Sequence, residues 1–259
     1  MTDAHGTISA ALPEERAPSA LVRLGNFFFR YREGLFPAVE LVLLLGLRPV
    51  LLNGSERQDR LLDALGVVVA LLGQALRVTV IGYAYIVRGG RNRRVYADGL
   101  VTEGFFAHSR NPLYVGNLLV IAGLFLINNN PWAYAIGIPF FLLGYRAIVA
   151  AEEAYLRGKF GAAYDAYTRD VPRWLPRLRG LGASLGPMHF NWRRVVLKEY
   201  GSTFAWTAGA IVLLVRETLA YHSYRERASY INALLVCLAL LTAAWASARW
   251  LKKSKRLTE

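Results

Sequence analysis

Ionisable side chains mark both ends of a pair of apolar segments in the middle of the chain. Arg110, Asn111 and Tyr114 stand where the first segment begins, and Glu152 and Glu153 stand where the second ends. Arginine can hold a carboxylate through two parallel hydrogen bonds, and a carboxylate can accept from hydroxyl groups or pair with an ammonium. These residue types therefore predict a site for a ligand that carries both positive and negative charge.

The elements that must position these residues are membrane-spanning helices. The chain has 259 residues, of which 54% are hydrophobic. A hydrocarbon core of ~30 Å requires ~20 apolar helical residues, and six segments approach that length. We predict spans at residues 35–52, 61–87, 113–128, 132–151, 204–220 and 230–249. The expected fold is all-α, a polytopic membrane protein with about six transmembrane helices.

Two of these segments are weaker than the others. Pro37, Glu40, Arg48 and Pro49 interrupt the first, so an interfacial or re-entrant segment is an alternative to a full span. The third is short and needs a neighbouring helix or a locally thin bilayer to cross.

The four residues 128–131, three asparagines and a proline, join the third and fourth segments. They have strong turn chemistry and no charge, which predicts a tight helical hairpin. Both ends of the hairpin then return to one membrane face. We expect the residues at its entrance and exit to lie close together: Arg110, Tyr114, Arg146, Glu152 and Glu153.

The net charge of +13 follows the membrane topology. Most Lys and Arg residues fall before the first span, between the second and third, between the fourth and fifth, and after the last. By the positive-inside rule, we expect both termini and the two long loops to face the cytoplasm. The basic excess then reflects topology and attraction to anionic lipid, and nucleic acid is not an expected partner.

Cysteine and histidine usage argues against a metal site. Cys237 is the only cysteine, so an intramolecular disulfide and a cysteine-ligated metal site are excluded. The four histidines are scattered, without ligand spacing, and we interpret them as surface or loop residues. Residues 1–18 lack the basic-then-apolar pattern of a signal peptide, so we expect the mature chain to keep them.

S-adenosylmethionine has the mixed charge that the site residues can recognise. Arg110 can clamp its carboxylate, while Glu152 or Glu153 can accept from its ribose hydroxyls or pair with its ammonium. Because adjacent helical residues diverge by ~100°, we expect one glutamate to bind the cofactor and the other to pair with an arginine or anchor a loop. Asn111 is suited to a helix N-cap. Gly116 and Gly123 share a helical face, which permits close approach of another helix or a flat ligand.

Five motifs occur in a fixed order through the middle third of the chain. They are Gly-Phe-Phe at 104–106, Arg-Asn-Pro-Leu-Tyr-Val-Gly at 110–116, Glu-Glu at 152–153, Phe-Gly-Ala-Ala-Tyr-Asp-Ala-Tyr at 160–167 and Val-Pro-Arg at 171–173. Their order and spacing resemble the isoprenylcysteine carboxyl methyltransferase and phospholipid methyltransferase superfamily of integral membrane enzymes. Asn111 departs from the family pattern, which has histidine there. An acid–base role is therefore not expected at this position, whereas a hydrogen-bonding role is.

The resemblance implies an S-adenosylmethionine site at the cytoplasmic interface. Its cofactor-binding residues would be Arg110, Asn111, Tyr114, Glu152 and Glu153. We assign Arg173 as the catalytic residue that orients the acceptor, with Trp174 as a second acceptor-binding residue, because arginine can hold a carboxylate or phosphate beside an apolar tail. An interfacial loop anchored by these two residues is the alternative. Tyr164 and Tyr167 are interpreted as packing residues.

The predicted function is methyl transfer to a lipophilic acceptor, either an isoprenoid or prenyl carboxylate or a lipid headgroup. Alignment and exclusion of water can supply much of the catalysis. A carboxylate acceptor is favoured because it needs no base and the sequence offers none. One alternative is an NADPH-dependent sterol or enone reductase, in which Arg91, Arg93 and Arg94 would contact the extra phosphate. Another is a non-catalytic membrane scaffold.

Four regions follow from this reading of the chain. Residues 1–34 form an N-terminal cytoplasmic or interfacial segment, in which the aromatic and basic run 27–32 is typical of an interfacial anchor. Residues 35–87 carry the first two spans, and 88–179 form the methyltransferase core. Residues 180–259 form a linker and an accessory hairpin, which would close a lipid-facing cavity or support a homo-oligomer.

Overall fold

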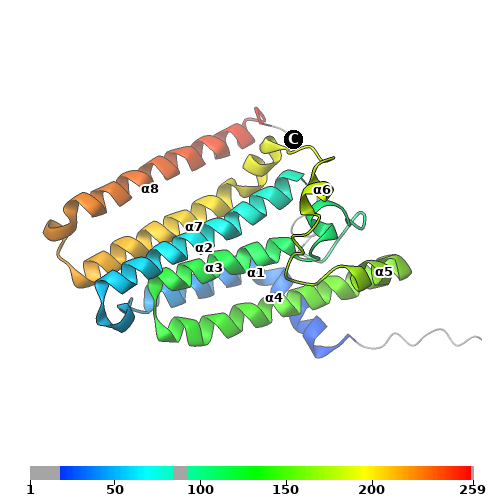
Figure 1. Ribbon diagram of the computed structural model, residues 1–259, viewed down its shortest axis with the longest axis horizontal. Coiled ribbons are helices and arrows are strands. Elements are labelled where there is room, and N and C mark those ends of the chain that lie inside the picture. Colours follow the sequence, from blue (N-terminus) through cyan, green and yellow to red (C-terminus); the bar gives the residue numbers. More distant parts are fainter. Residues whose placement is uncertain (1–17, 84–92, 258–259) are drawn as a thin grey trace, which may run out of the picture.

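The regular elements in the described part of the chain are helices. The computed structural model describes residues 18–83 and 93–257 (Figure 1). In chain order these ranges contain α1 (Ala20–Gly46), the 3-10 helix η1 (Leu52–Gly54), α2 (Glu56–Tyr83), η2 (Gly104–Ala107), α3 (Pro112–Asn128), α4 (Pro131–Phe160), α5 (Ala162–Asp170), α6 (Leu181–Leu185), α7 (Trp192–Tyr221) and α8 (Tyr224–Lys253). The all-α prediction is confirmed.

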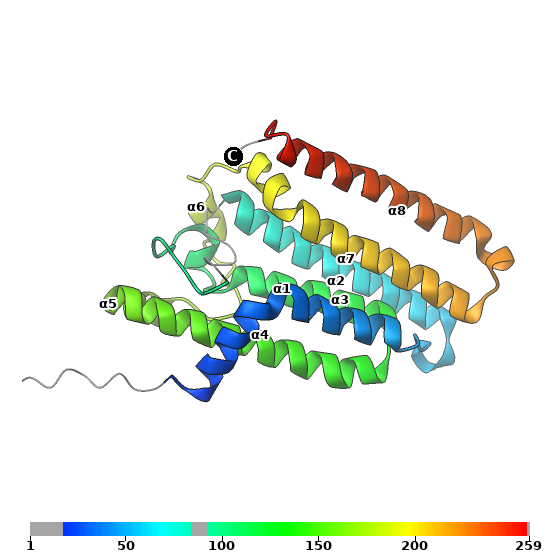
Figure 2. The same cartoon turned by 180° about the vertical axis from the view of Figure 1, so that it is seen from behind.

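Helix length and composition support a polytopic membrane protein. Within the described ranges, α2, α4, α7 and α8 are each long and apolar enough to cross a membrane. The apolar α3 has only 17 residues. α1 contains Pro37, which removes a backbone donor, and Figure 2 shows this helix bending along its length. Crossing of the bilayer by α1 and α3, and hence the total of six spans, stays a prediction.

Three predictions concern residues outside the described ranges. They are the retained N-terminal segment at 1–17, the last residues of the second span at 84–87, and most of the basic loop at 88–92. This loop includes Arg91. Arg93 and Arg94 are described, and both are exposed.

The polar turn between α3 and α4 is tight, as its sequence predicts. Asn129 adopts a left-handed φ of 39°, and Asn130 is the N-cap of α4, where its side chain accepts from the backbone N–H of Trp132 at 2.9 Å. The two side-chain amides also donate to the carbonyl oxygens of Val50 and Arg48, at 2.8 and 2.7 Å. The turn is thereby tied to the linker between α1 and α2.

Each arm of this hairpin packs mainly against another helix, α3 along α2 and α4 along α1 (Figures 1 and 2). Gly116 and Gly123 of α3 face Gly73 and Gly66 of α2. A Cβ at Gly73 would lie 2.6 Å from the carbonyl oxygen of Gly116, and one at Gly123 would lie 2.4 Å from that of Gly66. The glycines therefore admit another helix, as predicted, and that helix is α2.

The C-terminal hairpin lies on the outside of the bundle, with α8 against α7 (Figure 1). Only 6% of the apolar window of α8 is buried, compared with 39% in α2 and 44% in α4. Such an exposed apolar helix fits contact with lipid. Its role in closing a cavity or supporting an oligomer stays a prediction.

Gly73→Ala should lower the thermal midpoint of the detergent-solubilised protein. The added Cβ would meet the Gly116 carbonyl oxygen at 2.6 Å, and crowding of a packed core costs ~1–3 kcal/mol. Gly209→Ala on α7 is the matched control, because a Cβ there has no heavy atom within 4 Å. Equal midpoints for the two variants would contradict the close contact of α2 with α3.

Candidate functional site

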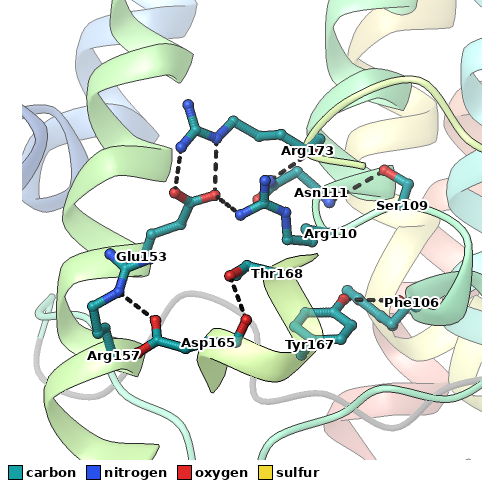
Figure 3. Close-up of polar contacts among 10 residues, drawn as sticks. All are labelled: Phe106, Ser109, Arg110, Asn111, Glu153, Arg157, Asp165, Tyr167, Thr168 and Arg173. Carbon is teal, nitrogen blue, oxygen red and sulfur yellow. Dashed lines mark hydrogen bonds and ion pairs between the residues drawn. The ribbon is translucent and has the colours of Figure 1, made fainter. Parts of the chain in front are cut away.

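The predicted site residues meet at one end of the bundle, where α3 begins and α4 ends. Arg110 and Asn111 directly precede α3, and Glu153 lies on the last turns of α4 (Figure 3). The segment after α5 carries Arg173 back beside them. The entrance and exit of the hairpin are therefore adjacent in space, as the turn chemistry predicts.

Glu153 is held between two arginines. Arg110 Nη1 donates to Oε1 at 2.8 Å, and Arg173 donates through Nε to Oε1 at 3.0 Å and through Nη2 to Oε2 at 2.7 Å (Figure 3). The side chain of Glu153 is 8% exposed, that of Arg110 13% and that of Arg173 47%. Two guanidinium groups on one nearly buried carboxylate leave a net positive charge, which attracts an anionic ligand.

Glu152 has a separate set of partners. The Tyr114 hydroxyl donates to Glu152 Oε1 at 2.6 Å, and Arg32 Nη1 donates to the Tyr114 oxygen at 2.7 Å. The same Arg32 nitrogen lies 3.8 Å from Glu152 Oε1. The two glutamates thus point to different neighbours, as the helical period predicts.

Arg32 of α1 is a site residue that our sequence reasoning missed. The aromatic and basic run 27–32 predicts only an interfacial anchor. In the structure the Arg32 guanidinium stacks over the ring of Phe29, 4.1 Å from its centroid, while Arg30 is exposed. The available signal was the spacing of Arg32 three residues after Phe29, which places both on one helical face.

Two side chains at the entrance of α3 fix the segment that carries Arg173. Asn111 Nδ2 donates to the carbonyl oxygen of Arg173 at 2.9 Å, and Ser109 Oγ donates to that of Trp174 at 2.7 Å. Asn111 occupies the N-cap position of α3 but makes no capping hydrogen bond with its side chain. The predicted N-cap position is confirmed, but the amide bonds the loop instead of a backbone N–H of α3. Trp174 packs against the hydrophobic core.

Tyr164 and Tyr167 of α5 have the packing role that we predict. Tyr164 is 1% exposed, and burial, followed by the charge of Glu153, raises its pKa to about 12. Tyr167 donates to the carbonyl oxygen of Phe106 at 2.7 Å, and burial raises its pKa too (Figure 3). Neither phenol ionises near neutral pH. Arg146, which we expected in the cluster, is exposed and forms no ion pair with a described residue.

Two polar groups of the cluster have no hydrogen-bond partner among the described residues. Arg110 Nε is buried without a hydrogen-bond acceptor among the described residues. Glu152 Oε2 accepts no hydrogen bond from them. A buried polar group without a partner costs ~1–3 kcal/mol. The pair therefore fits a ligand that presents an anionic oxygen together with hydroxyl or ammonium donors.

A second polar cluster, also missed from the sequence, lies inside the bundle between α2 and α7. Arg77 donates through Nε and Nη2 to the two carboxylate oxygens of Glu199, each at 2.9 Å, and their side chains are 7% and 2% exposed. Arg77 also donates to Asn117 of α3, and Gln74 donates to Glu199 at 3.3 Å. These charges are paired and hydrogen-bonded, as buried ions must be. The signal in the sequence was a lone arginine within an apolar span.

A family model described as phospholipid methyltransferase matches residues 63–163 of this chain. The matched range runs from α2 into α5. It contains Arg110, Asn111, Tyr114, Glu152 and Glu153, whereas Arg173 lies beyond it.

Two bacterial relatives are similar to more than half of the chain. The nickel-cobalt-cadmium resistance protein NccN of Alcaligenes xylosoxydans xylosoxydans is 30% identical over 166 residues, which are 64% of this chain and 73% of that protein. The cobalt-zinc-cadmium resistance protein CzcN of Cupriavidus metallidurans is 32% identical over 164 residues, 62% of this chain and 71% of that protein. Within the described ranges of our chain, no group of three or more His, Cys, Asp or Glu side chains could hold a metal ion.

A third relative carries a methyltransferase description. The protein-S-isoprenylcysteine O-methyltransferase of Schizosaccharomyces pombe is 31% identical over 113 residues, 40% of this chain and 45% of that protein. No solved structure matches the chain. None of these descriptions names a reductase, so the comparisons give that alternative no support.

Proposed function

The chain belongs to the isoprenylcysteine carboxyl methyltransferase and phospholipid methyltransferase superfamily of integral membrane enzymes, and from this premise we propose that it methylates a lipophilic acceptor with S-adenosylmethionine. The observation that carries the proposal is the charged cluster in which Glu153 is shared by Arg110 and Arg173 beside Glu152. S-adenosylmethionine supplies a methyl group on a positively charged sulfur, which makes that carbon an electrophile.

The two groups without protein partners would suit the polar parts of this cofactor. The buried Arg110 Nε would donate to its carboxylate, and Glu152 Oε2 would accept from its ribose hydroxyls or its ammonium. Tyr114 and Arg32 hold the other oxygen of Glu152 in place. In this division of roles Glu152 is a direct ligand, whereas Glu153 positions the two arginines.

Arg173 would orient the acceptor. It is the most exposed member of the cluster, at 47% for the side chain, while the neighbouring Trp174 packs on the hydrophobic core. An anionic group could therefore bind at the guanidinium while its apolar tail remains among lipid-facing side chains. Alignment of acceptor and methyl donor in a water-poor site lowers the barrier. Because Tyr164 and Tyr167 keep their protons, a carboxylate acceptor, which needs no base, is favoured over an amine or hydroxyl.

Glu152→Gln should weaken S-adenosylmethionine binding ~10- to 100-fold, because a hydrogen bond to a charged group is worth ~1.5–3 kcal/mol. Glu153→Gln should act mainly on stability, because it removes the charge that two guanidinium groups share. Titration calorimetry measures the change in cofactor affinity, and the thermal midpoint measures the change in stability. Glu103→Gln, at an exposed position, is the control. If both test variants stay folded and bind the cofactor as the parent does, neither carboxylate serves this site.

Arg173→Lys should reduce turnover ~10-fold and leave cofactor affinity nearly unchanged, because lysine keeps the charge but loses the planar two-donor geometry. The assay is transfer of a labelled methyl group to lipids extracted from the native membrane. Arg177→Lys is the matched control in the same segment, since this side chain is exposed and forms no ion pair with a described residue. If Arg173→Lys transfers the methyl group at the parental rate, Arg173 serves only as an interfacial anchor.

The site should face the cytoplasm together with both termini, because the loops on that side carry the basic excess. Cysteines introduced as Ala107→Cys and Ala163→Cys, in a background that lacks Cys237, should react with an impermeant reagent only after the cells are opened. Arg57→Cys, at the other end of the bundle, should react in intact cells. The reverse labelling pattern would overturn this orientation.

A further inference from the structure

An open groove with a volume of about 400 Å³ lies on the outside of the bundle between α7 and α8. Its walls are largely aliphatic side chains of these two helices: Ile211, Val212, Val215, Leu219, Leu235 and Leu238. Two arginines, Arg48 and Arg216, line the same groove. Roughly 20 Å of α1, at 1.5 Å per residue, separates Arg48 from the level of Arg32, so this α7–α8 groove lies at the end of the bundle away from the Glu152 and Glu153 site.

Two hydrogen bonds connect α7, beside the groove, to the end of α1. Arg216 Nη1 donates to the carbonyl oxygen of Leu44 at 2.5 Å and so satisfies one of the last carbonyl groups of α1. The Tyr221 hydroxyl donates to the carbonyl oxygen of Pro49 at 2.8 Å. Both bonds fasten α7 to the end of α1, which places the guanidinium of Arg216 beside the segment that carries Arg48.

Neither guanidinium is neutralised by the protein that the structure describes. Arg216 has only its bond to a carbonyl oxygen, and the side chain of Arg48 has no hydrogen bond or ion pair with a described residue. Glu217, next to Arg216 in sequence, forms no ion pair with either arginine. Two unpaired cations thus line a groove whose other walls are largely aliphatic.

We propose that the α7–α8 groove binds an anionic phospholipid. Arginine holds phosphate through parallel hydrogen bonds, so the phosphate would bind at Arg48 and Arg216, and an acyl chain would follow the aliphatic walls. A lipid without net charge would leave the positive charge of this pair uncompensated, and an inorganic anion would leave the apolar walls uncovered. An anionic lipid alone satisfies both the arginine pair and the aliphatic walls. This inference is independent of methyl transfer.

Native mass spectrometry can count the lipids that the purified protein retains. The protein would be equilibrated with equal amounts of phosphatidylglycerol and phosphatidylcholine that carry the same acyl chains. We expect at least ~10-fold preferential retention of phosphatidylglycerol, from charged hydrogen bonds worth ~1.5 kcal/mol or more. Arg48→Gln should abolish this preference without unfolding, because its side chain has no partner in the described protein. Arg225→Gln, an exposed arginine at the same end of the bundle but outside the groove, should retain the lipid as the parent does.

Two further measurements separate the groove from a surface charge effect. Leu238→Trp should fill the groove and reduce phosphatidylglycerol retention even though both arginines remain. Millimolar inorganic phosphate should not displace the lipid. Equal retention of the two lipids by the parent would overturn the proposal, as would equal loss in Arg48→Gln and Arg225→Gln. Displacement by inorganic phosphate would overturn it as well, because the site would then recognise an ion rather than a lipid.

Discussion

A carboxylate at the boundary of a hydrocarbon layer must be neutralised or remain in water, because desolvation of an unpaired charge is expensive. Glu153 meets this constraint with Arg110, from the entrance of α3, and Arg173, from the segment after α5. Three stretches of chain that are distant in sequence therefore converge on one side chain (Figure 3). The arrangement also leaves one positive charge in excess. This excess positive charge is thus a consequence of how the fold stabilises its own acidic residue.

The rest of the bundle holds this convergence in place. The glycine contact with α2 fixes the position of α3, and the asparagine turn fixes where α4 starts. The buried ion pair of Arg77 and Glu199 connects α7 to α2, and the bond from Arg77 to Asn117 extends the connection to α3. This pair lies deep among apolar side chains, where an ion pair specifies one arrangement of helices because a shifted register would leave its charges unpaired. Backbone contacts and one buried ion pair together determine where the N-terminal end of α3 lies.

Features encoded locally could be predicted from the sequence, and features created by helix docking could not. The asparagine run 128–131 carries its own turn chemistry, so the proximity of Arg110 to Glu153 followed from it. Arg32 reaches the site only because α1 docks on α4, with the backbone at Gly25 close against Ala147. No short sequence motif indicates that α1 packs against α4. Likewise, nothing near Asn111 indicates that its amide bonds a loop more than sixty residues later.

The central claim is that the charged cluster recognises S-adenosylmethionine, and titration calorimetry on the detergent-purified protein tests it most directly. The titrants are S-adenosylmethionine, its demethylated product and NADPH. We expect the first two to bind with one molecule per chain, because both carry the carboxylate, ammonium and ribose hydroxyls that Arg110 and Glu152 can hold, and we expect no binding of NADPH. Binding of NADPH, or the absence of heat from all three titrants with the folded protein, would contradict the account.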